Sequence, residues 1–211
     1  MKVIKNLRIT LLLFPWLIPE LAVSQPIPVE WAMGNTYGTV NLVLFKNFTR
    51  ESKFGFFHMN TIRFNYTDHS QNDFILQDLA YAEIVKNIRI TGGVIYSPSG
   101  FNPTAGMQYV HVGEKLLFLL APRINIEPDP CWDVMTIVQF RPALSQRTKL
   151  YTRLQLLNLF DRNGNINSYQ WMRLGLEIHG IQFGLAFNLD EYGPHPSVKT
   201  NLGAFIRKEI F

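Results

Sequence analysis

The chain has 211 residues and a formal net charge of +4; 47% of its residues are hydrophobic, 17% are charged and 13% are aromatic. Its lysines and arginines are scattered rather than clustered, which argues against nucleic-acid binding. The single cysteine, Cys131, excludes an internal disulfide and any multi-cysteine metal site. Few charges and many aromatic residues suit a chain that exposes an apolar surface to lipid.

Residues 1–24 have the three parts of a secretory signal peptide: basic residues within the first eight positions, an apolar run from Ile9 to Ile18, and small residues at Ala22-Val23-Ser24. We therefore expect cleavage before Gln25 and a single mature domain, 25–211. A membrane-anchoring helix is disfavoured, because the apolar run is about half the roughly 20 residues that a span needs. No later apolar run reaches that length, which excludes a helical inner-membrane protein.

The mature sequence reads as a series of β-strands without a convincing helix or repeat. The expected strands are Val29 to Gly34, Tyr37 to Asn47, Lys53 to Tyr66, Asp73 to Val85, Ile88 to Tyr96, Ala105 to Val112, Lys115 to Ile126, Cys131 to Arg141, Arg147 to Phe160, Asn167 to His179, Ile181 to Asp190 and Ser197 to Ile210.

The connections between these strands alternate in expected length. The short ones are 49–52, 86–87, 113–114, 143–146 and 180, and the longer ones are 67–72, 97–104, 127–130, 161–166 and 191–196. This asymmetry is typical of up-and-down outer-membrane barrels, which have short periplasmic turns and longer external loops. If both chain ends are periplasmic, the weak strand Val29 to Gly34 must count, and the total is twelve. Ten strands are the alternative if that segment is a tail and one of the breaks between strands is a bulge.

The segment Gly180 to Asp190 alternates without exception between large apolar residues and small or polar ones. Such a strand lies between two different environments. In a membrane barrel, Phe183, Leu185 and Phe187 would face lipid, and the opposite face would line the lumen. A soluble barrel with an apolar interior is the alternative.

The pattern of the mature chain resembles small outer-membrane β-barrels of the kind found in Bacteroidota. The likeness is strongest in Met172-Arg-Leu-Gly-Leu, Ile181-Gln-Phe-Gly-Leu and the C-terminal segment Leu202 to Phe211. It implies that the terminal aromatic residue, Phe211, is read by the outer-membrane assembly machinery. Arg207 and Glu209 share the face of Phe211, where that class usually has apolar residues.

The strand faces assigned to the lumen carry more basic than acidic residues. They are Arg63, Arg89, Arg141, Arg153, Arg173 and Arg207, against Asp133, Glu177 and Glu209. An excess of cations in a narrow pore favours anionic solutes. The alternative is that the arginines pair with the acids and fill a narrow barrel.

Catalytic and metal-binding patterns are weak. The serines of the mature chain lie mostly in turns and none sits mid-strand beside a histidine, although His58 and Asn60 share one strand face and Asp68-His69-Ser70 form a loop run. Asp161 to Asn165 lacks the glycine position and the final Glu of a calcium loop, and an Asn-Gly turn explains it better. We expect no metal and no cofactor.

These observations predict an all-β protein, an antiparallel up-and-down transmembrane barrel in the outer membrane. The leading hypothesis is a non-enzymatic barrel, either a small porin-like channel with a basic lumen or a structural component. A barrel-embedded lipid-modifying hydrolase and a secreted soluble barrel that binds an apolar ligand are the alternatives. The expected partners are outer-membrane lipid and the assembly machinery.

Overall fold

The computed structural model describes residues 27–49, 51–126, 129–195 and 197–210; the predicted signal peptide (1–24) and Phe211 lie outside these ranges. The described elements are twelve strands and one 3-10 helix: β1 (Ile27–Gly34), β2 (Tyr37–Asn47), β3 (Phe54–Asn65), η2 (His69–Gln71), β4 (Asp73–Val85), β5 (Ile88–Ser97), β6 (Gly100–Val112), β7 (Leu116–Asn125), β8 (Cys131–Phe140), β9 (Thr148–Asp161), β10 (Gly164–Ile178), β11 (Ile181–Tyr192) and β12 (Ser197–Ile210).

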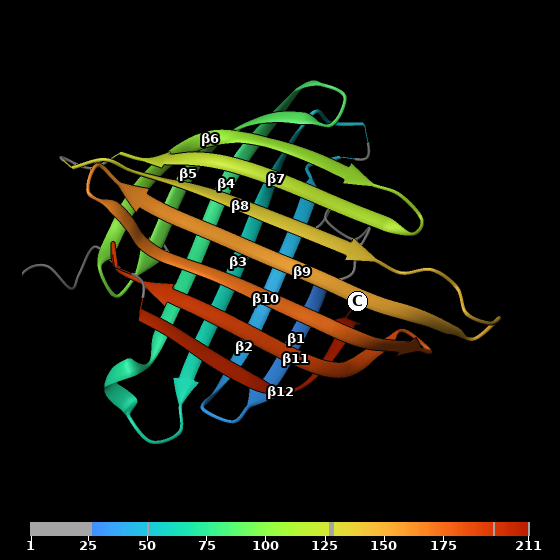
Figure 1. Ribbon diagram of the computed structural model, residues 1–211. Helices are drawn as coiled ribbons and strands as arrows, with labels where there is room; N and C mark the ends of the chain where they lie inside the picture. Colours follow the sequence, from blue (N-terminus) through green and yellow to red (C-terminus); the bar gives the residue numbers. More distant parts are fainter. Residues whose placement is uncertain (1–26, 50, 127–128, 196, 211) are drawn as a thin grey trace, which may run out of the picture.

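The strands form one closed barrel in which each strand pairs antiparallel with the next one along the chain (Figure 1). β1 closes the barrel by pairing with β12, from Ile27 opposite Ile210 to Gly34 opposite Gly203. The up-and-down topology and the count of twelve are therefore confirmed, and the alternative of ten strands is wrong. The weak first strand is a full member of the sheet.

The predicted alternation of loop lengths is wrong. At the end of the barrel where β1 begins and β12 ends, the connections are 48–53, 86–87, 113–115, 141–147 and 179–180; at the other end they are 35–36, 66–72, 98–99, 126–130, 162–163 and 193–196. Two supposed loops are mostly strand, because Ser97 pairs with Gly100 and Asp161 pairs with Gly164 across tight turns. Glycine and proline residues correctly located the turns, but they did not predict how many residues each turn contains.

The two faces of the sheet differ in chemistry. Large apolar side chains are exposed on the outer face, including Phe183 and Leu185, which are 42% and 63% exposed. Polar and charged side chains of the inner face are buried, among them Gln182 and Asn188. A soluble protein exposes mainly polar side chains and buries apolar ones. The distribution seen here, with apolar side chains outside and polar ones inside, matches a transmembrane barrel. No helix in the described ranges is long and apolar enough to cross a membrane.

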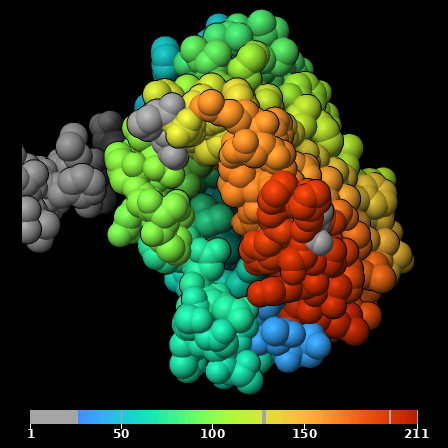
Figure 2. Space-filling view, turned by 60° about the vertical axis from the view of Figure 1, so that its left-hand side comes forward, coloured from blue at the N-terminus to red at the C-terminus, as the bar shows by residue number. Residues whose placement is uncertain are grey.

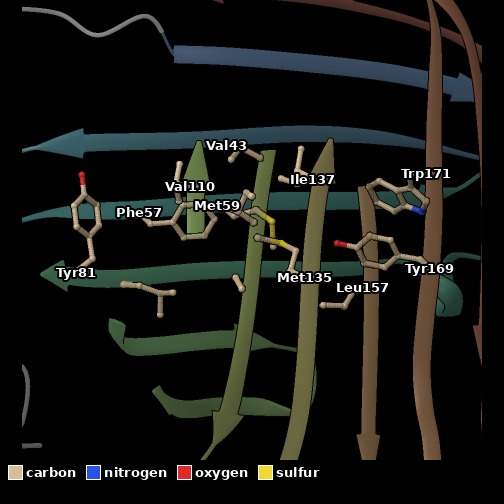
Figure 3. Close-up of a cluster of buried hydrophobic side chains, with 13 residues drawn as sticks. Val43, Phe57, Met59, Tyr81, Val110, Met135, Ile137, Leu157, Tyr169 and Trp171 are labelled. Atoms are coloured by element: carbon tan, nitrogen blue, oxygen red, sulfur yellow. The ribbon is translucent and has the colours of Figure 1, made fainter. Parts of the chain in front are cut away.

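In Figure 1 the strands of the near wall, β7 to β12, cross those of the far wall, β2 to β4, at a steep angle. At the end opposite the described termini, the surface is hollowed between the teal β3–β4 segment and the red β12 segment (Figure 2). Deeper inside, side chains from β2, β3, β4 and β6 meet side chains from β7 to β10 in an apolar cluster (Figure 3). Its members are Val43, Phe57, Met59, Leu79, Tyr81, Val110, Leu119, Ala121, Met135, Ile137, Leu157, Tyr169 and Trp171.

Gly184 allows β10 and β11 to pack closely. A Cβ atom at this position would lie 2.2 Å from the carbonyl oxygen of Leu174 and 2.5 Å from the Cα atom of Gly175. Gly184 therefore makes room for backbone atoms of the neighbouring strand.

Gly184→Ala should therefore destabilise the barrel by about 1–3 kcal/mol, as overpacking does. The matched control is Gly92→Ala, because a Cβ atom at Gly92 would meet nothing within 4 Å. Denaturant unfolding of the two variants in lipid vesicles measures the difference. Equal unfolding midpoints would contradict the close-packing role of Gly184.

Candidate functional site

The barrel interior contains a charged network centred on Glu30 of β1. Its carboxylate accepts a hydrogen bond of 2.9 Å from Nε of Arg173 on β10 and lies 3.7 Å from Nη1 of Arg153 on β9. Arg173 also donates to Asn188, and Arg153 donates to Gln155. These charged side chains are almost completely buried, so the network is a low-dielectric site in which each charge counts strongly.

Two further groups of charges lie near the ends of the barrel interior. At the end opposite the described termini, Arg63 pairs with Asp190 at 3.0 Å, donates to the Tyr192 hydroxyl and lies over the ring of Tyr37. At the other end, Arg141 bridges Glu177 at 3.4 Å and Glu209 at 3.5 Å. Glu177 is also paired with Lys149.

Two arginine–acid pairs join neighbouring strands. Arg123 on β7 donates to Asp133, its direct partner on β8, and Arg89 lies 3.6 Å from Glu83 and over the ring of Tyr81. Eight of the nine residues assigned to the lumen by sequence therefore have an ionic partner, and all nine lie on inner-face positions. The exception among the described residues is Arg207, which is 7% exposed and has no acidic side chain within ion-pair distance.

Sequence reasoning missed several members of this interior. Glu30 lies in the weak first strand, and Arg123 lies near the end of β7. Asp190 and Lys149 are further partners that the lumen assignment left out. All four occupy strand positions that alternate with outward-facing apolar residues, so they belong to the inner face. This alternation is the sequence pattern that would have identified them.

Cavities open at both ends of the described barrel. One of 360 Å³ lies at the end near the described termini, between Phe45, Leu117, Gln139, Arg153 and Arg207 among others. Cavities of 300 Å³ and 240 Å³ lie at the opposite end; Arg63, Asp73 and Lys199 line the first, and Met59, Gln77 and Arg123 line the second.

A layer of fully or almost fully buried side chains separates the first and third cavities. Along β8, for example, Asp133 lines one cavity, Ile137 lines the other, and Met135 lies between them. We call this set the central layer: Phe57, Leu119, Ala121, Met135 and Gln155. The interior therefore has a basic cavity at the end near the described termini, cavities at the opposite end, and a packed middle.

The loop at 66–72 borders the 300 Å³ cavity through Gln71 and Asn72. Asp68 caps η2, and its pKa lies below the ordinary value because the Ser70 hydroxyl and the Gln71 amide donate hydrogen bonds to the carboxylate. Lys199 of β12 donates to Gln71 at 2.9 Å and so ties the loop to the barrel rim.

The candidate catalytic residues do not come together inside the barrel. His58 and Asn60 alternate with Phe57 and Met59, so they lie on the outer face, where Nδ1 of His58 lies 2.7 Å from Asp78. In the described ranges, serine hydroxyls bond to groups two or three positions away in the chain, and none bonds to a histidine. No cluster of three or more metal-ligating side chains occurs among those residues either.

No protein-family model matches the sequence, and no curated protein matches it. Solved structures do match. A KdgM porin in complex with disordered oligogalacturonate and a NanC porin each give a TM-score of 0.50, at 10% and 9% identity. Each alignment covers 89% of this chain and 100% of the porin chain. An outer-membrane channel from Pseudomonas putida F1 gives a TM-score of 0.47 at 11% identity, over 90% of this chain and 97% of that channel. At such identities the likeness shows a shared fold, that of outer-membrane porin barrels.

Proposed function

We propose that this protein is a non-enzymatic outer-membrane barrel that lets small anions pass, in the manner of a porin. The observation that carries the proposal is the interior cluster in which Arg153, Arg173 and Arg207 surround a single buried carboxylate, Glu30. An excess of positive charge inside a low-dielectric wall lowers the energy of an anion there. The KdgM porin of similar fold was solved with an oligogalacturonate, which is itself an anionic saccharide.

The central layer makes this a gated rather than a wide pore. Phe57 and Met135 are fully buried between the cavities of the two ends, so a solute passes only when these side chains move. The basic cavity would gather anions, and the layer would limit their flux. A purely structural barrel is the competing function, in which the arginine–acid pairs serve only to fill the interior.

Export by a signal peptide, insertion through a C-terminal strand ending at Phe211, and Bacteroidota-type ancestry belong to the same proposal. The apolar outer face supports lipid contact at Phe183, Leu185 and Phe187. Cell fractionation tests the location: we expect the protein in the outer-membrane fraction, and recovery from the soluble periplasm would contradict a membrane role.

Bilayer recording tests the channel. In a KCl gradient, the refolded protein should give a reversal potential on the anion-selective side, and Arg207→Gln should move that potential toward zero. Arg147→Gln, which removes the same charge from an exposed turn, is the matched control and should leave the potential unchanged. Complete absence of conductance from correctly folded protein would contradict the channel and favour the structural role.

A further inference from the structure

Arg207 is a buried cation that lies near Glu30 but makes no direct ion pair among the described residues. Its Nε atom has no hydrogen-bond partner, and the nearest acids are engaged elsewhere: Glu209 pairs with Arg141, and Glu30 pairs with Arg173 and Arg153. A buried charge without a partner is costly. A bound anion would remove that cost.

Arg207 lies in the wall of the 360 Å³ cavity, and Arg153, whose Nε atom is also without a partner, lines the same cavity. The cavity therefore has two guanidinium groups in its wall. Guanidinium groups suit carboxylate, phosphate and sulfate oxygens, which they can bind by two parallel hydrogen bonds.

The rest of the cavity wall combines Gln139 and the Arg141–Glu209 ion pair with a larger apolar surface. Five of its lining residues are large apolar side chains contributed by β2, β6, β7 and β8: Val43, Phe45, Val112, Leu117 and Ile137. An inorganic anion would leave this surface in contact with water only. An alkyl chain would cover it and gain the free energy of apolar burial.

We propose that the cavity binds an amphipathic organic anion, with its charged head on Arg207 and Arg153 and its alkyl chain along the apolar residues. This inference deepens the proposed function, since the cavity belongs to the same basic interior. Membrane lipid and free amphiphiles in the surrounding medium both supply that chemistry.

Calorimetric titration of the protein in phosphatidylcholine nanodiscs tests the site, with sodium acetate, butanoate, hexanoate and octanoate as probes. Affinity should rise by roughly threefold for each added methylene while the chain still finds apolar wall. 1-Octanol, which has the same chain without the charge, should bind at least tenfold more weakly than octanoate, after subtraction of the signal from empty nanodiscs.

Variants assign the head group to Arg207. Arg207→Gln should weaken octanoate binding at least tenfold, and Arg207→Lys should retain most of it. Arg147→Gln, in an exposed turn at the same end of the barrel, is the charge-matched control. Equal octanoate affinity of the wild type and Arg207→Gln would overturn the proposal, as would acetate binding as tightly as octanoate or no octanoate binding at all.

Nanodiscs that contain phosphatidylglycerol distinguish the two sources. Octanoate affinity lowered by phosphatidylglycerol assigns the site to an anionic lipid, and unchanged affinity assigns it to a free amphiphile; both results fit the proposed site. Conductance of the same preparations separates the two proposals. Conductance without octanoate binding overturns only this inference, whereas octanoate binding without conductance overturns only the channel.

Discussion

Glu30→Gln is expected to lower the free energy of unfolding by about 3–5 kcal/mol, because it removes the single acid from a buried group of arginines. Glu30 is 2% exposed, and its two arginine partners are buried as well. Without the carboxylate, Arg153 and Arg173 repel each other in a low-dielectric interior. Gln has nearly the same shape as Glu, so the lost stability measures the contribution of the charge.

A double-mutant cycle isolates this interaction. Arg173→Met removes one of the cations that Glu30→Gln would leave without a partner. Glu30→Gln should therefore cost less in that background than in the wild type. Glu51→Gln, at an exposed turn residue, is the matched control and should have almost no effect. Denaturant unfolding in lipid vesicles gives the free energies. Equal costs of Glu30→Gln in both backgrounds would contradict the network.

Strand number and strand faces were predictable because they depend on local alternation. The run from Gly180 to Asp190 has one apolar and one small or polar face, and β11 places these faces outside and inside as expected. The segment Val29 to Gly34 was counted as a strand only because an even number of strands is needed to keep both chain ends on one side of the membrane. Its pairing with β12 shows that topological parity can recover a strand whose own pattern is weak.

Ion pairing across the barrel could not be predicted in the same way. Glu30 and Arg173 are 143 positions apart in the chain. They meet because β1 closes the barrel against β12, so that only β11 and β12 lie between β1 and β10. Parity places both side chains inside, but it does not say which acid approaches which arginine. That choice depends on the stagger of the strands.

His58 shows how parity changes the meaning of a polar residue. From sequence, His58 and Asn60 were candidates for a catalytic group because they share a strand face. In the barrel this is the outer face, and the partner of His58 is Asp78 on the adjacent strand. No serine hydroxyl in the described ranges bonds to a histidine, so this pair lacks the nucleophile that the hydrolase hypothesis needs.

The central layer lies between the cavities of the two ends of the barrel. Phe57→Ala combined with Met135→Ala should raise single-channel conductance at least severalfold, because these fully buried side chains lie between the cavities of the two ends. Each truncation leaves a cavity and costs about 2–5 kcal/mol of stability, so conductance must be compared only among folded preparations.

Phe56→Ala provides the matched control, since Phe56 is the outward neighbour of Phe57 on β3 and lies away from the path between the cavities. It removes the same side chain without opening the interior, and its conductance should equal that of the wild type. If the folded Phe57→Ala/Met135→Ala variant also conducts like the wild type, ions do not pass through the central layer. Because this layer separates the two ends of the barrel, that result would leave the interior arginines with a packing role, as in a structural barrel.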